Sequence, residues 1–379
     1  MPWKQSTDLE QRERLVLAML RRREPVQVIC RQWGISRQTA YKYLRRYRRE
    51  GRSGLKAMRR GPKQRHGVAW VRYARLIQQK RRRQPTWGAR KLRWWLREHQ
   101  PYRRVPSERT VERWLQSAGL IRRRRPRARP PQWQPRVRQV RRSNAVWTFD
   151  WKGWYLTGDG TKFEPLTVRD LGSRCLLWVL PVAGRSESVV RRVCRRLFRR
   201  YGCPKVIRTD QGGPFWSTGP YGLTSLSLWW YRLGIEVEFV RRHAGIDNNA
   251  HEQMHGVMKR ETASPPARTR QAQIRRLRCW QRRYNQERPH AAIGQCPPAR
   301  RYRPQPGPLP PLRLPCYPDG WLVRKVRANG DLHLGGRRHY LGRAFAGMLV
   351  GCKPVPAGHR IYFLRLLLTT IATPSRHQT

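Results

Sequence analysis

Two proline-rich stretches separate regions of this 379-residue chain that can each build a core. Residues 122–142 contain four prolines and ten arginines, and residues 295–318 are again rich in proline. Such segments bury too little apolar surface to fold, so linkers are predicted over 122–143 and 295–318. The chain is therefore expected to fold as separate domains before, between and after these linkers.

The charge of the chain indicates its partner. Lys and Arg total 83 against 22 Asp and Glu, a formal net charge of +61, while 38% of the residues are hydrophobic. That apolar content argues against a disordered chain, and so much positive charge predicts binding to a polyanion, nucleic acid above all. Residues 1–143 carry +35 and residues 144–379 carry +26, so the front third is expected to be the main DNA-binding region.

The composition also excludes other classes of protein. No apolar run reaches about 18 residues, which excludes a membrane span, and the first residues lack the apolar core of a signal peptide. The eight cysteines form no CxxC pair, which argues against a zinc knuckle and against a disulfide framework. An intracellular chain without a small-molecule cofactor is expected.

Residues 1–60 predict a helix-turn-helix domain. Apolar residues have helical spacing over 8–23, a short helix over 25–33 ends at Gly34, and Ser36 caps a third helix over 37–49. This third helix is expected to present five side chains to DNA: Arg37, Gln38, Lys42, Arg45 and Arg46. A plain basic three-helix bundle is the alternative.

A second helix-turn-helix-like, DNA-binding domain is predicted over 61–121. Helices are expected after Trp87 and after Pro106, the second with Ser107 as its N-cap. The linker that follows is expected to track a phosphate backbone with Arg122, Arg123, Arg124 and Arg125. A solvated run of charge with no dedicated partner is the alternative.

Residues 144–294 predict an α/β domain, and residues 319–379 predict a small five-stranded β-barrel. Strands of the α/β domain are expected over 146–151, 163–168, 175–182, 206–210 and 235–240, and helices over 186–201, 223–233 and 250–260. This order is typical of a mixed sheet covered by helices. In the barrel, turn signals at Asn329-Gly330 and Gly335-Gly336 separate short apolar strands, and the last strand is expected over 360–368.

Three acidic residues of the α/β domain fall where a metal site needs them. Asp150 lies in an apolar strand, Asp210 ends a strand before a glycine turn, and Glu252 is expected in the first turn of the following helix. Oxygen ligands without His or Cys suit hard cations such as Mg²⁺ or Mn²⁺. Two such ions can activate an attacking oxygen and stabilise the leaving one at a phosphodiester.

Each of these acids also has a structural interpretation. Asp150 can pair with an arginine, Asp210 can be an ordinary turn residue, and Glu252 can close a capping box with Asn249. Asp247 lies five residues before Glu252 and competes with it as third ligand if the helix has another register. The occurrence of all three acids in this order in a basic chain favours the catalytic interpretation.

Three segments resemble the DDE transposases of bacterial insertion sequences: Asn144 to Asp150, Ile207 to Phe215 and His251 to Glu261. Tyr284 to His290, followed by Pro297-Pro298-Ala299, is similar to the segment that closes the catalytic core of that family. The resemblance implies an RNase H-like core similar to that of retroviral integrases, a front helix-turn-helix domain and an SH3-like tail barrel. It also implies Asp150, Asp210 and Glu252 as the catalytic residues that bind two Mg²⁺ or Mn²⁺ ions. Two departures stand out: the 41 residues between Asp210 and Glu252 exceed the gap in many relatives, and Asp247 offers a competing carboxylate five residues before Glu252. Asp170 also matches a family pattern but is expected to be structural.

The function implied by the resemblance is transposition. The protein would bind the terminal inverted repeats of its element, cleave DNA strands with two metal ions, and join them to target DNA. Lys259 and Arg260 follow Glu252 on its helix and are expected to hold phosphates, with a solvated helix face as the alternative. Joining two ends implies a homo-oligomer, and the expected location is the bacterial cytoplasm, associated with the nucleoid. The alternatives are a non-catalytic transposase remnant that acts as a repressor or architectural protein, and a nuclease that cuts without joining.

Residues His251-Glu252-Gln253-Met254-His255 also match H-E-x-x-H, the zinc-protease signature. The motif is expected at the beginning of a helix rather than inside one, and no carboxylate follows at about twenty residues to act as third ligand. A protease would also leave the charge of +61 unexplained. A zinc metalloprotease is therefore a remote alternative.

Overall fold

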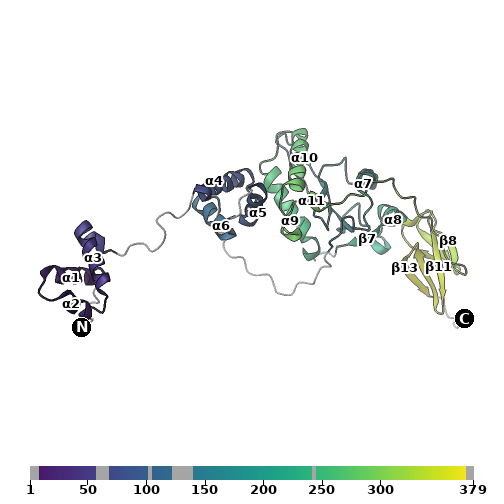
Figure 1. Ribbon diagram of the computed structural model, residues 1–379. Coiled ribbons are helices and arrows are strands. Elements are labelled where there is room, and N and C mark those ends of the chain that lie inside the picture. Colours follow the sequence, from purple (N-terminus) through teal and green to yellow (C-terminus); the bar gives the residue numbers. More distant parts are fainter. Residues whose placement is uncertain (1–7, 57–67, 101–104, 122–139, 241–244, 373–379) are drawn as a thin grey trace, which may run out of the picture. The chain divides into compact units, whose positions relative to one another are not determined.

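A computed structural model of the chain describes residues 8–56, 68–100, 105–121, 140–240 and 245–372, with side chains not described at 68–69 and 245–250 (Figure 1). The chain divides into two compact units, Met1–Val71 and Arg72–Thr379. Helices in the described part never combine the length and apolarity needed to cross a bilayer. The finer domain boundaries given above stay predictions.

The first unit has the helical arrangement that the sequence predicts. Its elements are α1 (Asp8–Arg21), α2 (Val26–Gln32), α3 (Arg37–Glu50) and the 3-10 helix η1 (Gly51–Leu55). Leu15, Val16, Ile29, Ala40 and Leu44 are buried together between the helices. Ser36 caps α3, because its Oγ accepts a hydrogen bond from the Thr39 N–H at 3.2 Å.

The second unit begins with three further helices: α4 (Val68–Arg83), α5 (Ala89–His99) and α6 (Glu108–Ser117). Ser107 caps α6 as predicted, accepting a hydrogen bond from the Thr110 N–H at 3.2 Å. Trp87 precedes α5 and is buried in the same core as Leu92 and Leu115. The tryptophan therefore belongs to the packing of this helical layer rather than to the helix itself.

A five-stranded mixed sheet forms the centre of the second unit, which confirms the prediction of a mixed sheet. Its order is β5-β4-β1-β6-β7, where β1 is Val146–Trp151, β4 is Leu166–Asp170, β5 is Leu176–Trp178, β6 is Val206–Thr209 and β7 is Glu236–Phe239. The strand β1 is antiparallel to β4 and parallel to β6. A separate short hairpin, β2 (Tyr155–Leu156) and β3 (Lys162–Phe163), takes up residues that the sequence assigns partly to the predicted strand 163–168.

Helices cover both faces of the sheet (Figure 1). On one face α7 (Glu187–Tyr201) and α8 (Ser225–Arg232) share a core with Trp147 and Phe149. On the other face lie α9 (Gly245–Thr262) and α10 (Arg270–Gln286), and Thr148 of β1 contacts α9. Because side chains alternate along a strand, β1 directs its aromatic residues to one layer and its polar residues to the other.

The tail contains two separate sheets, so the predicted closed barrel is not confirmed. The strands β8 (Leu322–Lys325), β11 (Leu349–Val355), β12 (Gly358–Phe363) and β13 (Leu366–Ala372) form one antiparallel sheet, and β9 (Asp331–Leu334) pairs with β10 (Arg337–Tyr340) in another. The strand predicted over 360–368 is broken at Leu364, whose φ is 54°. The sequence pattern did not predict the strand β11, because Gly351, Lys353 and Pro354 interrupt its alternation of apolar and polar residues.

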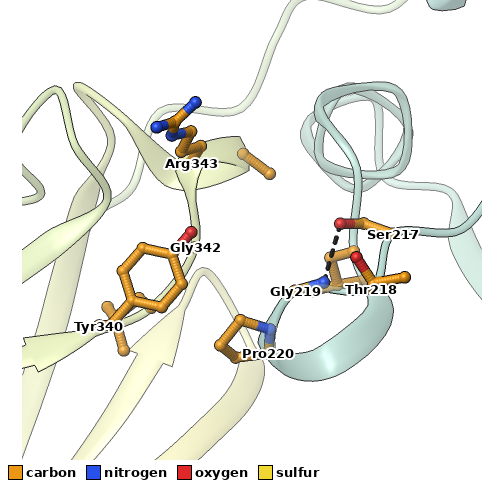
Figure 2. Close-up of a pocket in the computed structure, with 10 residues that line it drawn as sticks. Ser217, Thr218, Gly219, Pro220, Tyr340, Gly342 and Arg343 are labelled. Atoms are coloured by element: carbon orange, nitrogen blue, oxygen red, sulfur yellow. Dashed lines mark hydrogen bonds between the residues drawn. The ribbon is translucent and has the colours of Figure 1, made fainter.

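The tail packs against the central domain through a shared core and a cavity beside it. Leu223 and Leu228 are buried among apolar residues of the tail. The 3-10 helices η2 (Pro220–Gly222) and η4 (Arg343–Phe345) flank a cavity of about 250 Å³ (Figure 2). In it the Ser217 Oγ accepts the Gly219 N–H at 3.1 Å. The residues lining this cavity include no carboxylate, so its chemistry does not suit a metal site.

The helices α4–α6 dock on the segment that follows α10, which contains η3 (Ala291–Ile293) and α11 (Pro298–Arg301). The Lys91 Nζ donates a hydrogen bond to the Pro289 carbonyl, and Arg300 pairs with Glu98 at 2.6 Å. Burial and the charge of Arg288 lower the pKa of Lys91 to about 8, although the charge of Glu261 acts in the opposite direction. This docking surface therefore places several cations close together.

His290, in this docking segment, is expected to make the fold sensitive to acid. Burial and the charges of Lys91, Arg169, Arg288 and Arg174 lower the pKa of His290 to about 2. Below about pH 6.5 His290 binds a proton in the unfolded chain but not in the folded chain. The free energy of unfolding therefore falls as the pH falls. At pH 4.5 this one group is expected to cost roughly 2–3 kcal/mol of unfolding free energy relative to pH 7.

Urea unfolding at pH 7 and pH 4.5 measures this effect in the variant His290→Phe. The phenyl ring keeps the edge contact with Tyr284, whose ring centroid lies 4.8 Å from that of His290, and removes the titration. The variant is expected to lose less stability on acidification than the parent protein. The exposed His99 provides the control, and an unchanged pH slope in His290→Phe would contradict the prediction.

Candidate metal and catalytic site

Asp150 lies near the end of β1, and Asp210 directly follows the neighbouring parallel strand β6. Thr148 of β1 pairs with Arg208 of β6, and each aspartate follows two residues later. Alternation along β1 then assigns the Asp150 carboxylate to the face that carries Thr148, which is the face covered by α9, and the register brings Asp210 level with Asp150 at the end of β6. A Cβ at Gly212 would lie 3.1 Å from an Asp210 carboxylate oxygen, so a larger residue there would press on that carboxylate.

Cationic side chains surround these carboxylates. Burial raises the pKa of Asp210, while the Gly212 N–H, 3.3 Å from its Oδ1, and the charge of Arg185 act in the opposite direction. Burial and the neighbouring charge of Lys259 lower the pKa of Lys152, and Asp150 acts against them. An anion such as a phosphate group near Lys152 and Lys259 would relieve their mutual repulsion.

Two histidines of α9 lie over β1 and β4 next to Asp150. The rings of His251 and His255 are 4.9 Å apart, and the His255 Nδ1 lies 3.8 Å from the Asp150 Oδ2. Within the described residues, Asp150, His251 and His255 are brought together as a group whose ligand atoms all lie within 4.8 Å of one another. The sequence reasoning did not use these histidines as partners of Asp150, although their spacing of four residues on a helix was a usable signal.

The surroundings of both imidazoles favour their neutral forms. Burial, His255 and Arg169 hold the pKa of His251 well below its usual range. Burial and the charges of Lys152 and Arg169 lower the pKa of His255 to about 3. Neutral imidazoles can act as metal ligands, which protonated ones cannot.

Glu252 lies on the same helix but outside this group. It is exposed, and in this structure it does not join Asp150 and Asp210 in a cluster of ligand atoms within 4.8 Å. The helix α9 begins at Gly245, earlier than predicted, so Glu252 lies about two turns inside it and Asn249 cannot cap its beginning. The predicted first-turn position and the capping-box alternative are therefore wrong. The side chain of Asp247 lies outside the described residues, so its competition with Glu252 stays open.

Asp170 has the structural role that the sequence suggests. It is fully buried and accepts hydrogen bonds from the N–H groups of Asn144 and Ser173 at 2.9 and 2.7 Å. Burial raises the pKa of Asp170, while these hydrogen bonds act against it. The carboxylate holds the segment before β1 against the end of β4, and in the described part of the chain it does not belong to a group of potential metal ligands.

The side chains predicted to bind DNA are mostly exposed. On α3, Arg37, Gln38, Lys42 and Arg45 are exposed and Arg46 is half-buried. On α9, Lys259 and Arg260 are also exposed. The predicted contacts Arg122, Arg123, Arg124 and Arg125 lie outside the described residues. These assignments stay predictions.

The zinc-protease alternative needs two histidine ligands from the H-E-x-x-H segment. The segment lies inside α9, contrary to expectation, and Asp150 supplies a nearby carboxylate. The two ring nitrogens of His251, however, lie 2.8 Å from the Thr148 Oγ1 and 2.7 Å from the Thr167 Oγ1. Both ring nitrogens of His251 are thus hydrogen-bonded to hydroxyl groups. Only the His255 Nδ1 faces the Asp150 carboxylate, whereas the zinc motif needs a nitrogen from each histidine.

Two segments of the chain match known protein families. Residues 11–63 match a helix-turn-helix domain, and residues 233–298 match an integrase core domain. The second match includes α9 and α10. The chain therefore contains one segment similar to a helix-turn-helix domain and one similar to an integrase core domain.

Proteins of bacterial insertion elements are among its relatives. An uncharacterized 31.7 kDa protein of insertion element IS407 from Burkholderia multivorans is 28% identical over 191 residues, or 50% of this chain and 66% of the relative. An uncharacterized 39.2 kDa protein of IS476 from Xanthomonas euvesicatoria is 28% identical over 180 residues, or 47% of this chain and 50% of the relative. The chain thus spans under two thirds of either relative. With the two family matches, these relatives confirm the resemblance to insertion-sequence transposases with an integrase-like core.

Solved structures of viral integrases are also similar. The catalytic core domain of HTLV-2 integrase, in complex with magnesium, matches with 14% identity over 43% of this chain and 99% of that chain, at a TM-score of 0.33. A simian T-cell lymphotropic virus intasome in complex with a PP2A regulatory subunit matches with 14% identity over 80% of this chain and 100% of that chain, at a TM-score of 0.35.

Proposed function

We propose that this chain is a DNA transposase that binds the terminal inverted repeats of its element and catalyses strand cleavage and strand transfer. Its reaction class would be polynucleotidyl transfer at a phosphodiester. The proposal rests on the integrase core and helix-turn-helix segments and on the basic charge of the chain. DNA is the substrate class that fits all three features.

The pairing of β1 with β6 is the observation that carries the catalytic part of the proposal. It brings Asp150, near the end of β1, level with Asp210, directly after β6, in a domain whose helix α9 carries Glu252. The carboxylate oxygens fit Mg²⁺ or Mn²⁺, and two such ions would supply activation of the attacking oxygen and stabilisation of the leaving one. A salt bridge with an arginine at Asp150 and an ordinary turn role for Asp210 would not explain why the two aspartates are brought level with each other.

The residues of the chain itself would bind and orient DNA around those ions. Lys152 and Lys259 would contact the phosphate next to the scissile bond, because their charges are close to Asp150 and to each other. Glu252, on the same helix as His255, would complete the ligand set. Joining two element ends to a target requires at least two copies of the chain, acting on the bacterial nucleoid.

An oligonucleotide strand-transfer assay tests the proposal. The full chain is incubated with duplexes that carry the ends of the element, supercoiled target DNA, and Mg²⁺ or Mn²⁺. Joined products that disappear with EDTA are expected. Cutting without joining would favour a nuclease, and specific end binding without cutting in either metal would favour a non-catalytic remnant.

Substitutions on α3 test the DNA-binding part separately. Arg37→Ala and Lys42→Ala are each expected to weaken binding to element ends about 10-fold at matched salt, because each removes one base or phosphate contact. Gel-shift titration measures this. Arg14→Ala on α1 is the matched control, since it removes an equally exposed charge outside α3. Equal weakening by all three would favour a plain basic bundle without a recognition helix.

A further inference from the structure

The hydroxyl group of Thr167 fixes the orientation of both histidines of α9. Its Oγ1 donates to the Asp150 main-chain carbonyl at 2.8 Å. The same Oγ1 lies 2.7 Å from the His251 Nε2 and 2.9 Å from the His255 Nε2. A hydroxyl group has one proton and two lone pairs, so Thr167 must accept from both nitrogens. Both Nε2 atoms therefore carry hydrogen.

This assignment leaves the two histidines with different roles. In a neutral imidazole with hydrogen on Nε2, Nδ1 carries a lone pair. The Nδ1 of His251 lies 2.8 Å from the Thr148 Oγ1 and accepts its hydroxyl proton, for which the Arg169 carbonyl oxygen, at 3.3 Å, is the more distant acceptor. The Nδ1 of His255 instead faces the Asp150 Oδ2 at 3.8 Å. Two electron-rich atoms thus face each other beyond hydrogen-bond distance.

A cation between these two atoms would turn their repulsion into coordination. Metal–oxygen and metal–nitrogen bonds of about 2.0–2.2 Å allow one ion to touch two ligands up to roughly 4 Å apart. The separation of 3.8 Å lies within that reach. Both side chains are largely buried, at 10% exposure for His255 and 13% for Asp150, so the ligands are already held in place.

We propose that His255 is a nitrogen ligand of the cation bound by Asp150, which gives this site a preference for Mn²⁺ over Mg²⁺. Imidazole suits transition metals, whereas Mg²⁺ prefers oxygen ligands throughout. His251, Thr148 and Thr167 are positioning residues, because they set the tautomer of His255 without facing the ion. This inference deepens the proposed function, since it rests on Asp150 as a metal ligand, and it names the metal that the reaction would use best.

Pulsed EPR of the full chain loaded with Mn²⁺ alone tests the nitrogen ligand directly. Modulation from a directly bound ¹⁴N nucleus is expected in the parent protein and is expected to be lost in His255→Gln. Mn²⁺ affinity, measured by EPR titration, is expected to fall at least about tenfold in that variant, whereas Mg²⁺ affinity, measured by competition, changes less than about threefold. Thr167→Val is expected to weaken the ¹⁴N signal while leaving the carboxylate intact.

The outcomes separate this inference from the proposed function. Mn²⁺ bound without ¹⁴N modulation, with binding lost in Asp150→Asn, would overturn the role of His255 and leave the carboxylate site standing. If His251→Gln abolishes Mn²⁺ binding and His255→Gln does not, the nitrogen ligand is His251, and the proposed role of His255 is overturned. If the parent protein and Asp150→Asn bind Mn²⁺ equally, or if neither binds it, both proposals are overturned. Circular dichroism and thermal unfolding of each variant confirm that a lost signal does not come from unfolding.

Discussion

Replacing Asp150 or Asp210 by asparagine is expected to lower the rate of strand joining at least about 1,000-fold, which corresponds to roughly 4 kcal/mol of transition-state stabilisation. Asparagine keeps the size of the side chain but removes the negative charge that would hold a divalent cation. Asp150 near the end of β1 and Asp210 directly after β6 are brought level by the pairing of these strands, so either substitution would damage the same site. The strand-transfer assay with element ends measures the rate.

Binding to element ends should survive these substitutions. The helix α3, which is proposed to read the ends, belongs to a separate compact unit from both aspartates. Asp159→Asn is the matched control, because it makes the same chemical change on an exposed turn of the same domain. Its rate should stay within about twofold of the parent rate. Joining activity that survived in Asp210→Asn and Glu252→Gln would contradict the assignment of the catalytic residues.

Much of the fold could be predicted because local signals and the packed structure agree. Ser36 and Ser107 cap helices where the sequence places them, since a side-chain oxygen at the N-cap satisfies a backbone donor without any tertiary partner. The strands β1 and β6 were also predicted, because each is a short apolar run bounded by turn residues. The closed tail barrel was not confirmed, because closure depends on pairings between distant strands that no local pattern reports.

The candidate site was predictable in part for the same reason. Asp150 lies near the end of one strand and Asp210 directly follows a parallel one, and the ends of parallel strands meet at one edge of a sheet, so their proximity could be predicted. The pairing of Asp150 with His255 could not be predicted, because it depends on where α9 begins and on which of its faces meets β4. The Asp-Asn-Asn sequence was interpreted as a cap, yet the helix runs through it from Gly245. The contacts of Thr167 with both histidines appear only once the sheet and α9 are packed together.

Glu261 is the second position at which a single substitution is expected to have a large effect, here on stability. Its carboxylate accepts hydrogen bonds from the Trp280 Nε1 at 2.6 Å and from the Arg288 Nη1 at 3.1 Å. The Thr86 hydroxyl donates to the same carboxylate. The side chains of Glu261 and Arg288 are 11% and 8% exposed. The network therefore joins the end of α9 to α10 and to the loop before α5.

Glu261→Gln is expected to lower the free energy of unfolding by about 3 kcal/mol or more, because it leaves the buried Arg288 guanidinium without its counter-charge. Urea unfolding measures the loss. Glu238→Gln is the matched control: Glu238 pairs with Arg208 at 2.8 Å but is 48% exposed, so its loss should cost less than about 1 kcal/mol. The double variant Glu261→Gln with Arg288→Met should be more stable than Glu261→Gln alone, because it also removes the unpaired charge. A double variant at least as unstable as the single one would show that packing, not charge, holds this junction together.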